Sequence, residues 1–266
     1  MTGTILDKIF SDKRARVEAA KSASDPVALR GLAIETRSAR GSHRLREALS
    51  DPSRINIIAE FKKASPSKGV INNSVDPAAV ARQYDEGGAA AISVLTEEDH
   101  FKGSLDDLRA VRAEVDLPIL RKDFIFEDFQ IYEAAAAGAD AILLIAAMLE
   151  DDRIERLRTT AEVELGLDAL IEVHTLDELE RVKKTGATLI GVNNRDLKTF
   201  HVTLDVSRKL IRYAPEGAIM VTESGLQTGN ELRELSDLGY SGFLIGETLM
   251  RTGDPAAELR RLRDSR

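Results

Sequence analysis

The chain has 266 residues, is 43% hydrophobic and 31% charged, and carries a formal net charge of -8. This composition is typical of a globular protein, and the negative charge argues against general nucleic-acid binding. The longest apolar run, Ala141–Leu149, is far too short to span a bilayer, so we expect neither a nucleic-acid nor a membrane partner. The absence of cysteine excludes disulfides, thiolate metal ligands and a thiol nucleophile. Together with an N-terminus that lacks a signal-peptide pattern, it predicts a cytoplasmic protein.

Residues 1–50 have the pattern of charged, amphipathic helices. Apolar side chains fall at helical spacing in the first part, at Ile5, Leu6, Ile9 and Phe10. A short second helix is expected over Leu45–Leu49. Because these apolar residues are too few for a core of their own, we predict an N-terminal helical extension over residues 1–50 that packs on a larger domain over residues 51–266.

From Ile57 onward, short apolar runs alternate with helix-patterned segments. The runs are Ile57–Ala59, Ala91–Leu95, Pro118–Leu120, Ala141–Ala146, Ala169–Val173, Leu189–Val192, Ile219–Val221 and Gly242–Ile245. The helical segments are Pro77–Glu86, Leu105–Glu114, Asp128–Ala137, Asp152–Leu165, Leu176–Lys184, Leu204–Tyr213, Gly229–Leu238 and Pro255–Arg263. Strands that alternate with helices indicate a parallel sheet, and strands that are apolar throughout indicate burial on both faces.

Eight such strand–helix units predict a single (β/α)8 TIM barrel in the α/β class. Glycines at Gly88, Gly138, Gly186 and Gly239 stand between a helix and the next strand, where a left-handed helix C-terminus is expected. A doubly wound open sheet is the alternative. No G-x-G-x-x-G follows any of the runs, which removes the dinucleotide-binding form of that fold.

In a barrel of this kind the chemistry lies at the C-terminal ends of the strands, and seven of the eight predicted strands end in polar residues. In chain order these residues are Glu60 and Lys62; Thr96, Glu97 and Glu98; Arg121, Lys122 and Asp123; Glu172 and His174; Asn193, Asn194, Arg195 and Asp196; Thr222, Glu223 and Ser224; and Glu247. Charges of both signs that converge on one opening are costly unless they bind or transform something. We expect Asp123, Glu98 and Asp196 to form ion pairs that only hold the barrel top together.

Three of these residues carry the chemical argument. Alternation along the first strand places Glu60 and Lys62 on one side, where each alters the proton affinity of the other. Lys122 could donate a proton, form a Schiff base, or pair with Glu60 or Glu172. A single histidine, His174, is poor support for a metal site, so we expect no metal.

Two further groups of residues suggest what is bound. Phe101 and Phe124 could receive a planar aromatic ligand, whereas Phe126 is expected to pack in the core. Ser224-Gly225 and Gly246-Glu247 close the last two strands, where barrels bind phosphate with backbone N–H groups and a short extra helix. Glycine lets the backbone approach the anion closely, and the Ser65 hydroxyl could add a contact. We therefore expect a phosphorylated small-molecule substrate.

Taken together, the motifs resemble the indole-3-glycerol phosphate synthase family. They are E-x-K with S-P-S at 60–67, L-T-E at 95–97, L-x-K-D-F at 120–124, L-I-E-V at 170–173, G-x-N-N-R-D-L at 191–197, E-S-G at 223–225 and L-I-G-E at 244–247. The resemblance covers nearly the whole chain. It implies a carboxy-lyase of tryptophan biosynthesis that converts 1-(2-carboxyphenylamino)-1-deoxyribulose 5-phosphate into indole-3-glycerol phosphate, carbon dioxide and water, with no cofactor.

The resemblance also implies a role for each residue of the site. Lys122 looks like the acid that protonates the developing oxyanion, and Glu172 looks like the group that assists dehydration. Lys62 would contact the substrate carboxylate and donate a proton during dehydration, Glu60 would hold the two lysines, and Asn193 would position a hydroxyl or the carboxylate. The implied substrate-binding residues are Arg195, Ser224, Glu223, Phe101, Phe124 and Leu197, and the implied phosphate-binding residues are Ser65, Gly225, Gly246 and Glu247. We expect a monomer with at most weak or transient contacts to pathway partners.

Two other interpretations remain open at this point. One is another phosphate-binding barrel enzyme, either a Schiff-base aldolase that uses Lys122 or a sugar-phosphate isomerase, although the isomerase usually requires a cysteine or an aspartate in its acid–base pair. The other is a barrel that serves as an interaction scaffold, which gives no reason for charged groups at seven strand ends. The loop Ala64–Asn73 could be a lid over the substrate or a static, solvated loop.

Overall fold

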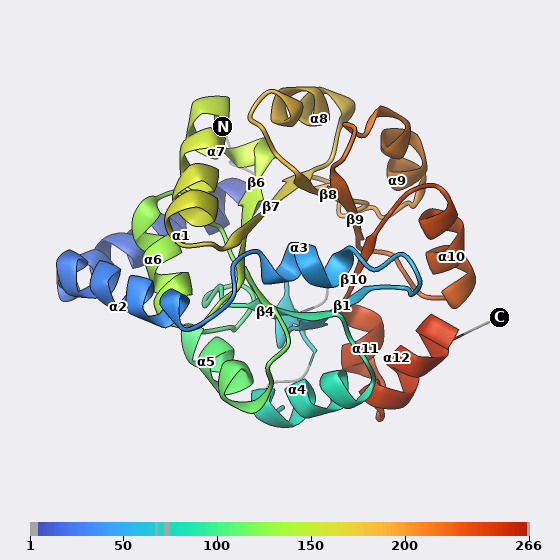
Figure 1. The fold of residues 1–266 in the computed structure, drawn as a ribbon, viewed down its shortest axis with the longest axis horizontal. Helices are drawn as coiled ribbons and strands as arrows, with labels where there is room; N and C mark the ends of the chain where they lie inside the picture. Colours follow the sequence, from blue (N-terminus) through green and yellow to red (C-terminus); the bar gives the residue numbers. More distant parts are fainter. Residues whose placement is uncertain (1–4, 67–68, 72–74, 265–266) are drawn as a thin grey trace.

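The computed structural model describes residues 5–66, 69–71 and 75–264, and its centre is a closed barrel of eight parallel strands (Figure 1). In order around the barrel these are β1 (Ile57–Phe61), β4 (Ala91–Leu95), β5 (Ile119–Lys122), β6 (Ala141–Ile145), β7 (Asp168–Val173), β8 (Leu189–Asn193), β9 (Ile219–Glu223) and β10 (Gly242–Ile245). The predicted (β/α)8 barrel is confirmed. Several strands run further than the apolar runs predicted, because the backbone ladder continues through polar residues, as in the pairing of Asn193 with Glu223.

Helices surround the barrel in the predicted order. They are α4 (Pro77–Glu86), α5 (Leu105–Glu114), α6 (Asp128–Ala136), α7 (Asp151–Thr159), α8 (Leu176–Lys183), α9 (Asp205–Leu210), α10 (Gly229–Asp237) and α12 (Pro255–Asp264), with a short extra helix α11 (Glu247–Arg251) after β10. The predicted helix over Asp152–Leu165 is divided, since α7 continues as a π-helix over Thr160–Glu164. Side-chain caps fix several starts; the Asp76 carboxylate, for example, accepts the Ala78 amide at the start of α4.

The glycines that follow four of these helices have the expected backbone conformation. Their φ angles are +77° at Gly88, +92° at Gly138, +73° at Gly186 and +117° at Gly239. Because only glycine adopts this left-handed region freely, each lets the chain reverse from the helix into the next strand.

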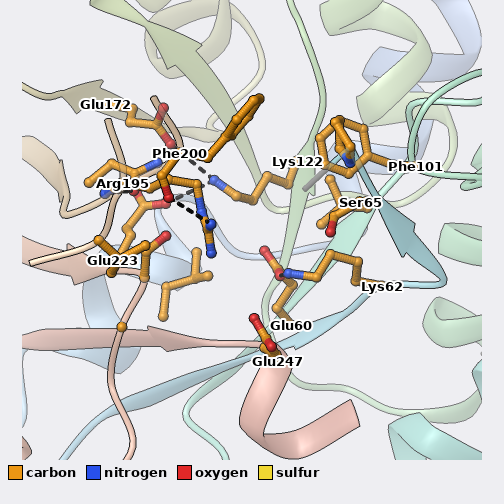
Figure 2. Close-up of a pocket in the computed structure, with 18 of the residues that line it drawn as sticks. Glu60, Lys62, Ser65, Phe101, Lys122, Glu172, Arg195, Phe200, Glu223 and Glu247 are labelled. Carbon is orange, nitrogen blue, oxygen red and sulfur yellow. Dashed lines mark hydrogen bonds and ion pairs between the residues drawn. The ribbon is translucent and has the colours of Figure 1, made fainter. Parts of the chain in front are cut away.

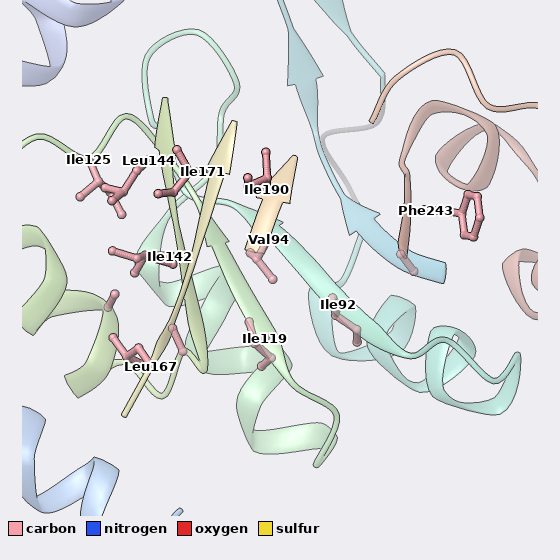
Figure 3. Packing of buried hydrophobic residues seen from close by; sticks show 14 of the residues in the cluster. Ile92, Val94, Ile119, Ile125, Ile142, Leu144, Leu167, Ile171, Ile190 and Phe243 are labelled. Carbon is pink, nitrogen blue, oxygen red and sulfur yellow. The ribbon is translucent and has the colours of Figure 1, made fainter. Parts of the chain in front are cut away.

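The apolar core has two layers. Side chains inside the barrel, such as Leu120, Leu170 and Val221, form one cluster, and the larger cluster lies between the strands and the helices. Figure 3 shows part of this outer layer, with Ile92 and Ile142 among its members. The helix-facing and inward-facing positions alternate along each strand, which explains the apolar runs in the sequence.

Three helices precede the barrel: α1 (Ile5–Ala23), α2 (Pro26–Ser38) and α3 (Arg44–Leu49). The sequence interpretation missed α2 as a separate element, although Asp25 caps it and Pro26 begins it. Helix α3 lies across the N-terminal end of the barrel (Figure 1), and its Leu45 and Leu49 join the inner cluster. Since the extension shares the barrel core, the division of the chain at residue 50 stays a prediction.

Buried ion pairs also hold the extension. Arg37 on α2 donates to Asp140 at 2.9 Å, and Lys13 on α1 donates to Asp123 at 2.8 Å. Removal of one partner of a buried pair leaves the other charge unpaired, so such contacts tie the helices to particular places on the barrel.

The loop after β1 contains a feature that the sequence did not predict. Strands β2 (Ala64–Ser65) and β3 (Gly69–Val70) pair antiparallel, Ala64 with Val70. Whether the loop Ala64–Asn73 is a lid or a static loop stays open, because its residues 67–68 and 72–73 lie outside the described residues. None of the described helices is long and apolar enough to cross a membrane.

The position of α3 generates a first prediction. Leu45→Ala should lower the free energy of unfolding by about 2–5 kcal/mol, because it leaves a void under the barrel. Leu32→Ala on α2, where the side chain is 51% exposed, should change it by less than about 1 kcal/mol. Denaturant titration measures both. Equal losses in the two variants would show that α3 does not complete the inner core.

Candidate active site

A cavity of about 830 Å³ opens at the C-terminal ends of the strands. All residues that the sequence analysis assigned to catalysis, substrate binding or phosphate binding line it, and Figure 2 shows ten of the lining side chains with labels. The structure therefore brings the predicted residues together, while the role of each stays a prediction. The cavity is large enough for a sugar phosphate with an attached aromatic ring.

Four charged side chains form the base of the cavity. Glu60, Lys122, Glu172 and Glu223 come from β1, β5, β7 and β9, which are alternate strands of the barrel. Alternate strands of a (β/α)8 barrel contribute the side chains of one interior layer, so closure of the sheet brings these four together. The layer is nearly dry, since the three carboxylates are at most 4% exposed.

Lys122 occupies the middle of this layer. Its Nζ lies 3.1 Å from Glu172 Oε2 and 2.8 Å from Glu223 Oε2 (Figure 2). Of the two partners proposed from sequence, Glu172 is confirmed, whereas Glu60 pairs with Lys62 instead, 2.5 Å from Oε1 to Nζ. Glu223 was missed as a partner of Lys122 because its distance across the barrel depends on closure of the sheet.

Burial and charge act in opposite directions on these groups. Burial lowers the pKa of Lys122, but the carboxylates of Glu172 and Glu223 outweigh it, and the pKa is raised above the ordinary value for lysine. Burial raises the pKa of Glu172, but Lys122 and His174 outweigh it, and the pKa is lowered. For Glu223, burial together with repulsion from Glu172 outweighs Lys122, so its pKa is raised. Lys122 is therefore an ammonium at neutral pH, and the pKa values of Glu172 and Glu223 shift in opposite directions.

Glycines on, or directly after, the intervening strands make room for the carboxylates. A Cβ at Gly191 on β8 would overlap Glu223 Oε1, and a Cβ at Gly246 would overlap Glu60 Oε1. Any other residue at these positions would force the carboxylate to shift. The G-x-N-N motif thus contributes space as well as side chains.

One wall of the cavity is apolar and aromatic. The rings of Phe101 and Phe124 lie 6.3 Å apart at 44°, and the Phe101 backbone is held by Glu97, whose carboxylate accepts its amide. Phe126 lies outside the cavity lining and packs edge-on against Phe10 at 5.0 Å, as the core assignment predicted. The sequence analysis missed several lining residues: Ile5, Leu6 and Ile9 of α1, and Phe200 and Val202 of the loop after β8.

The glycine turns expected to bind phosphate border the same cavity. Ser224 and Gly225 have φ angles of +68° and +81°, so the chain turns sharply after β9, and Gly246 directly precedes α11. The Glu247 side chain pairs with Arg251 at 3.1 Å. Because a carboxylate repels phosphate, Glu247 can serve an anion only through its backbone N–H.

The end of β8 and the loop after it contain two predicted site residues, Asn193 and Arg195, and two residues with structural contacts, Asn194 and Asp196. The Arg195 amide donates to Asn193 Oδ1 at 3.0 Å, and both residues line the cavity. Asn194 is buried and donates to the Thr222 hydroxyl, which ties β8 to β9. The ion pair expected for Asp196 is not found among the described residues; its carboxylate instead closes a local turn by accepting the amides of residues 198 and 199.

Asp123 and Glu98 form the predicted structural ion pairs. Asp123 Oδ2 accepts from Lys13 at 2.8 Å and from Arg121 at 3.0 Å, and Glu98 accepts from Lys13 at 2.9 Å. Burial raises the pKa of Asp123, but Lys13 and Arg121 outweigh it and lower the pKa to about 2. Lys13 lies on the buried face of α1 with Ile9 and Val17, and a lysine in that apolar pattern was the sequence signal for this missed contact.

Among the residues that the structure describes, no group of three or more histidine, aspartate or glutamate side chains is arranged to hold a metal ion. The buried layer of Lys122 with Glu60, Glu172 and Glu223 can transfer protons and stabilise charge. An acid–base layer at the mouth of a (β/α)8 barrel, in a cavity that aromatic side chains and glycine turns also line, is the arrangement of a barrel enzyme that acts on a phosphorylated small molecule.

Comparison with known proteins then identifies the family. A sequence profile of indole-3-glycerol phosphate synthase matches residues 6–262. The indole-3-glycerol phosphate synthase of Carboxydothermus hydrogenoformans is 48% identical over 258 residues, 96% of this chain and 97% of that protein. The enzyme of the same name from Neisseria meningitidis serogroup C is 46% identical over 261 residues, 97% of this chain and 98% of that protein. The chain belongs to the indole-3-glycerol phosphate synthase family, and the predicted decarboxylating lyase of tryptophan biosynthesis is confirmed.

The barrel also resembles more distant structures. The crystal structure of 3-hexulose-6-phosphate synthase from Salmonella typhimurium superposes with a TM-score of 0.62 at 12% identity, over 78% of this chain and 96% of that one. This similarity concerns the fold alone.

The glycine on β8 generates a second prediction. Gly191→Ala should displace the Glu223 carboxylate from Lys122 and lower kcat by about tenfold or more, which corresponds to one lost charge-assisted hydrogen bond. Gly253→Ala, where a Cβ meets nothing within 4 Å, is the matched control. Steady-state kinetics with thermal unfolding as a fold check measures the effect. If Gly191→Ala turns over as fast as the control, the Glu223 contact does not matter for the reaction.

Proposed function

We propose that this pocket closes the indole ring of 1-(2-carboxyphenylamino)-1-deoxyribulose 5-phosphate and releases carbon dioxide and water, with Lys122 as the central acid. The observation that carries the proposal is the Lys122 ammonium, 2.8 and 3.1 Å from two carboxylates and lining a cavity with an aromatic wall and glycine turns. A substrate with an aromatic ring at one end and a phosphate at the other has the polarity of this cavity.

Ring closure needs an acid at the substrate carbonyl. When the aromatic carbon attacks, the carbonyl oxygen becomes an alkoxide, which is far more basic than an amine. Lys122 is charged at neutral pH because of its carboxylate neighbours, so it stabilises the alkoxide and gives it a proton. The proton passes from Nζ to the oxygen, which remains on the substrate as a hydroxyl.

Two cations suit the substrate carboxylate. Lys62 and Arg195 line the cavity, and Lys62 is held in place by Glu60. Their role is to orient the carboxylate and with it the aromatic ring against Phe101 and Phe124 until carbon dioxide leaves. Leu197 and Asn193 complete this side, Asn193 with its amide available for a hydroxyl or carboxylate.

Dehydration needs a proton acceptor and a proton donor. The new ring loses its hydroxyl, which takes a proton from an ammonium and leaves as water, and the adjacent ring carbon loses a proton. Glu172 is ionised because Lys122 and His174 lower its pKa, so it can accept that proton. Lys62 also lines the cavity and is proposed to donate the proton to the leaving hydroxyl.

The phosphate is assigned to the glycine turns. The Ser65 and Ser224 hydroxyls and the backbone N–H groups of Gly225, Gly246 and Glu247 are the donors proposed for it. Support comes from the fact that all of these residues line the same cavity.

A Schiff-base aldolase is the second candidate that the sequence left open, and the site disfavours it. Imine formation requires a neutral amine, whereas Glu172 and Glu223 hold Lys122 in its charged form. Absence of a borohydride-trapped adduct on Lys122 is the expected result.

We also propose that the enzyme acts as a cytoplasmic monomer. A sequence without cysteine is compatible with a reducing compartment. Sedimentation analysis should give a mass of 29.1 kDa. A stable dimer would contradict the monomer.

Replacement of Lys122 tests the central acid. Lys122→Met should lower kcat by about a thousandfold, within the range of a lost general acid. Lys209→Met on α9, an exposed lysine, is the control. Indole fluorescence measures turnover with little protein background, because the chain has no tryptophan. Residual activity within a few-fold of wild type would remove Lys122 from this role.

Replacement of Glu172 separates the later step from the earlier ones. In Glu172→Gln, carbon dioxide release should run ahead of indole formation, since the variant lacks the base for dehydration but keeps the Lys122 acid. Quenched single-turnover reactions that follow both products measure this. Parallel slowing of both products would contradict the assignment of Glu172 to dehydration.

A further inference from the structure

His174 lies directly behind the acid–base layer, at the end of β7. Its side chain is 9% exposed and does not line the cavity. The two ring nitrogens face two different carboxylates: Nε2 lies 3.3 Å from Glu172 Oε1, and Nδ1 lies 3.5 Å from Glu178 Oε2 on α8. Glu178 Oε2 also accepts the His174 backbone amide at 2.6 Å, which fixes the carboxylate against the ring.

The two oxygens of Glu172 therefore face two different basic side chains. Oε2 pairs with the Lys122 ammonium, and Oε1 faces the His174 imidazole. A ring with protons on both nitrogens can serve Glu172 and Glu178 together. With that ring charged, Lys122, Glu172, His174 and Glu178 form a row of alternating charges from the cavity to a carboxylate on α8.

Lys122 alone does not decide which of its partners is ionised. Its contact with Glu223, 2.8 Å, is no longer than its contact with Glu172, 3.1 Å, and both carboxyls are buried. Two buried carboxylates that share one ammonium repel each other, so one of them tends to hold a proton. His174 breaks this symmetry: within the described part of the chain its ion-pair contacts are with Glu172 and Glu178.

We propose that His174, held by Glu178, is a positioning residue that keeps the negative charge on Glu172 and leaves the proton of the pair on Glu223. The inference rests on the proposed function for the use of Glu172 as a base. It adds that His174 and Glu178, which do not line the cavity, determine which of Glu172 and Glu223 is ionised. The proposal concerns only the position of the proton shared by Glu172 and Glu223, and no other bond forms or breaks.

The proton affinities of the groups agree with this arrangement. The charged groups that face His174 are Glu172 on its own strand, Glu178 on α8 and Glu223 on β9. Burial lowers the pKa of His174, but Glu178 and Glu172 outweigh it and raise the pKa. The imidazolium is therefore retained to a higher pH than in free histidine. Loss of this cation should raise the pKa of Glu172, because one of its two stabilising charges is gone.

The pH profile of kcat/KM tests the proposal. His174→Asn should move the acidic limb upward by about one pH unit, which is a tenfold loss of activity on that limb. Glu178→Gln should move it in the same direction by less, and it serves as a second route if His174→Asn does not fold. Glu180→Gln, on the same helix but 49% exposed and paired with Lys183, should leave the profile unchanged.

Nitrogen-15 spectra of the imidazole rings test the charge of His174 without turnover. The chain has four histidines, so His174→Asn assigns the signal by its loss. We expect both His174 nitrogens to carry protons at pH 7 in the free enzyme, and the titration to move to lower pH in Glu178→Gln. A neutral His174 at pH 7, or superimposable pH profiles for wild type and His174→Asn, would overturn the proposal. If wild type did not turn over the substrate, the proposed function would fail while the spectra still decided the charge of His174.

Discussion

The Lys122 ammonium, enclosed by two buried carboxylates, is the interaction around which the structure is arranged. Its contacts with Glu172 and Glu223 join β5 to β7 and β9, across strands that are not neighbours in the sheet. Removing ions from water costs several kcal/mol each, so the layer is tolerable only while its members stay paired. A closed barrel meets this condition, because alternate strands deliver side chains to one level of its interior. The remaining features of the molecule provide space for this layer, cover it or set its charge.

Space and cover come from residues that do no chemistry themselves. Gly191 and Gly246 leave room for the carboxylates of Glu223 and Glu60. Helix α3 fills the opposite end of the barrel with Leu45 and Leu49, and α1 adds apolar side chains to the cavity. The Lys13–Asp123 ion pair attaches α1 to the residue that follows Lys122. The extension is therefore part of the site as well as part of the core.

The charge of the site is set at two levels. Glu172 and Glu223 keep Lys122, the proposed acid, charged. In our proposal, the contact of His174 with Glu172 makes Glu172 the base. An active site with several buried carboxyls has to distribute few protons among many acceptors, and the neighbours of each group decide the distribution. In this chain the outer member of the row, Glu178, belongs to a helix, so the helix layer takes part in the electrostatics of the barrel interior.

The sequence by itself determined the barrel, the order of its elements and the residues at its mouth. Apolar runs, glycine stops and polar strand ends are local patterns, and alternation along one strand was enough to pair Glu60 with Lys62. The order and spacing of the motifs were also sufficient to indicate the family. Contacts between distant segments were not determined: Glu223 as the partner of Lys122, and Lys13 as the partner of Asp123. Only tertiary structure decided these, since closure of the barrel fixes which strand ends face one another, and no local periodicity records distances across the barrel.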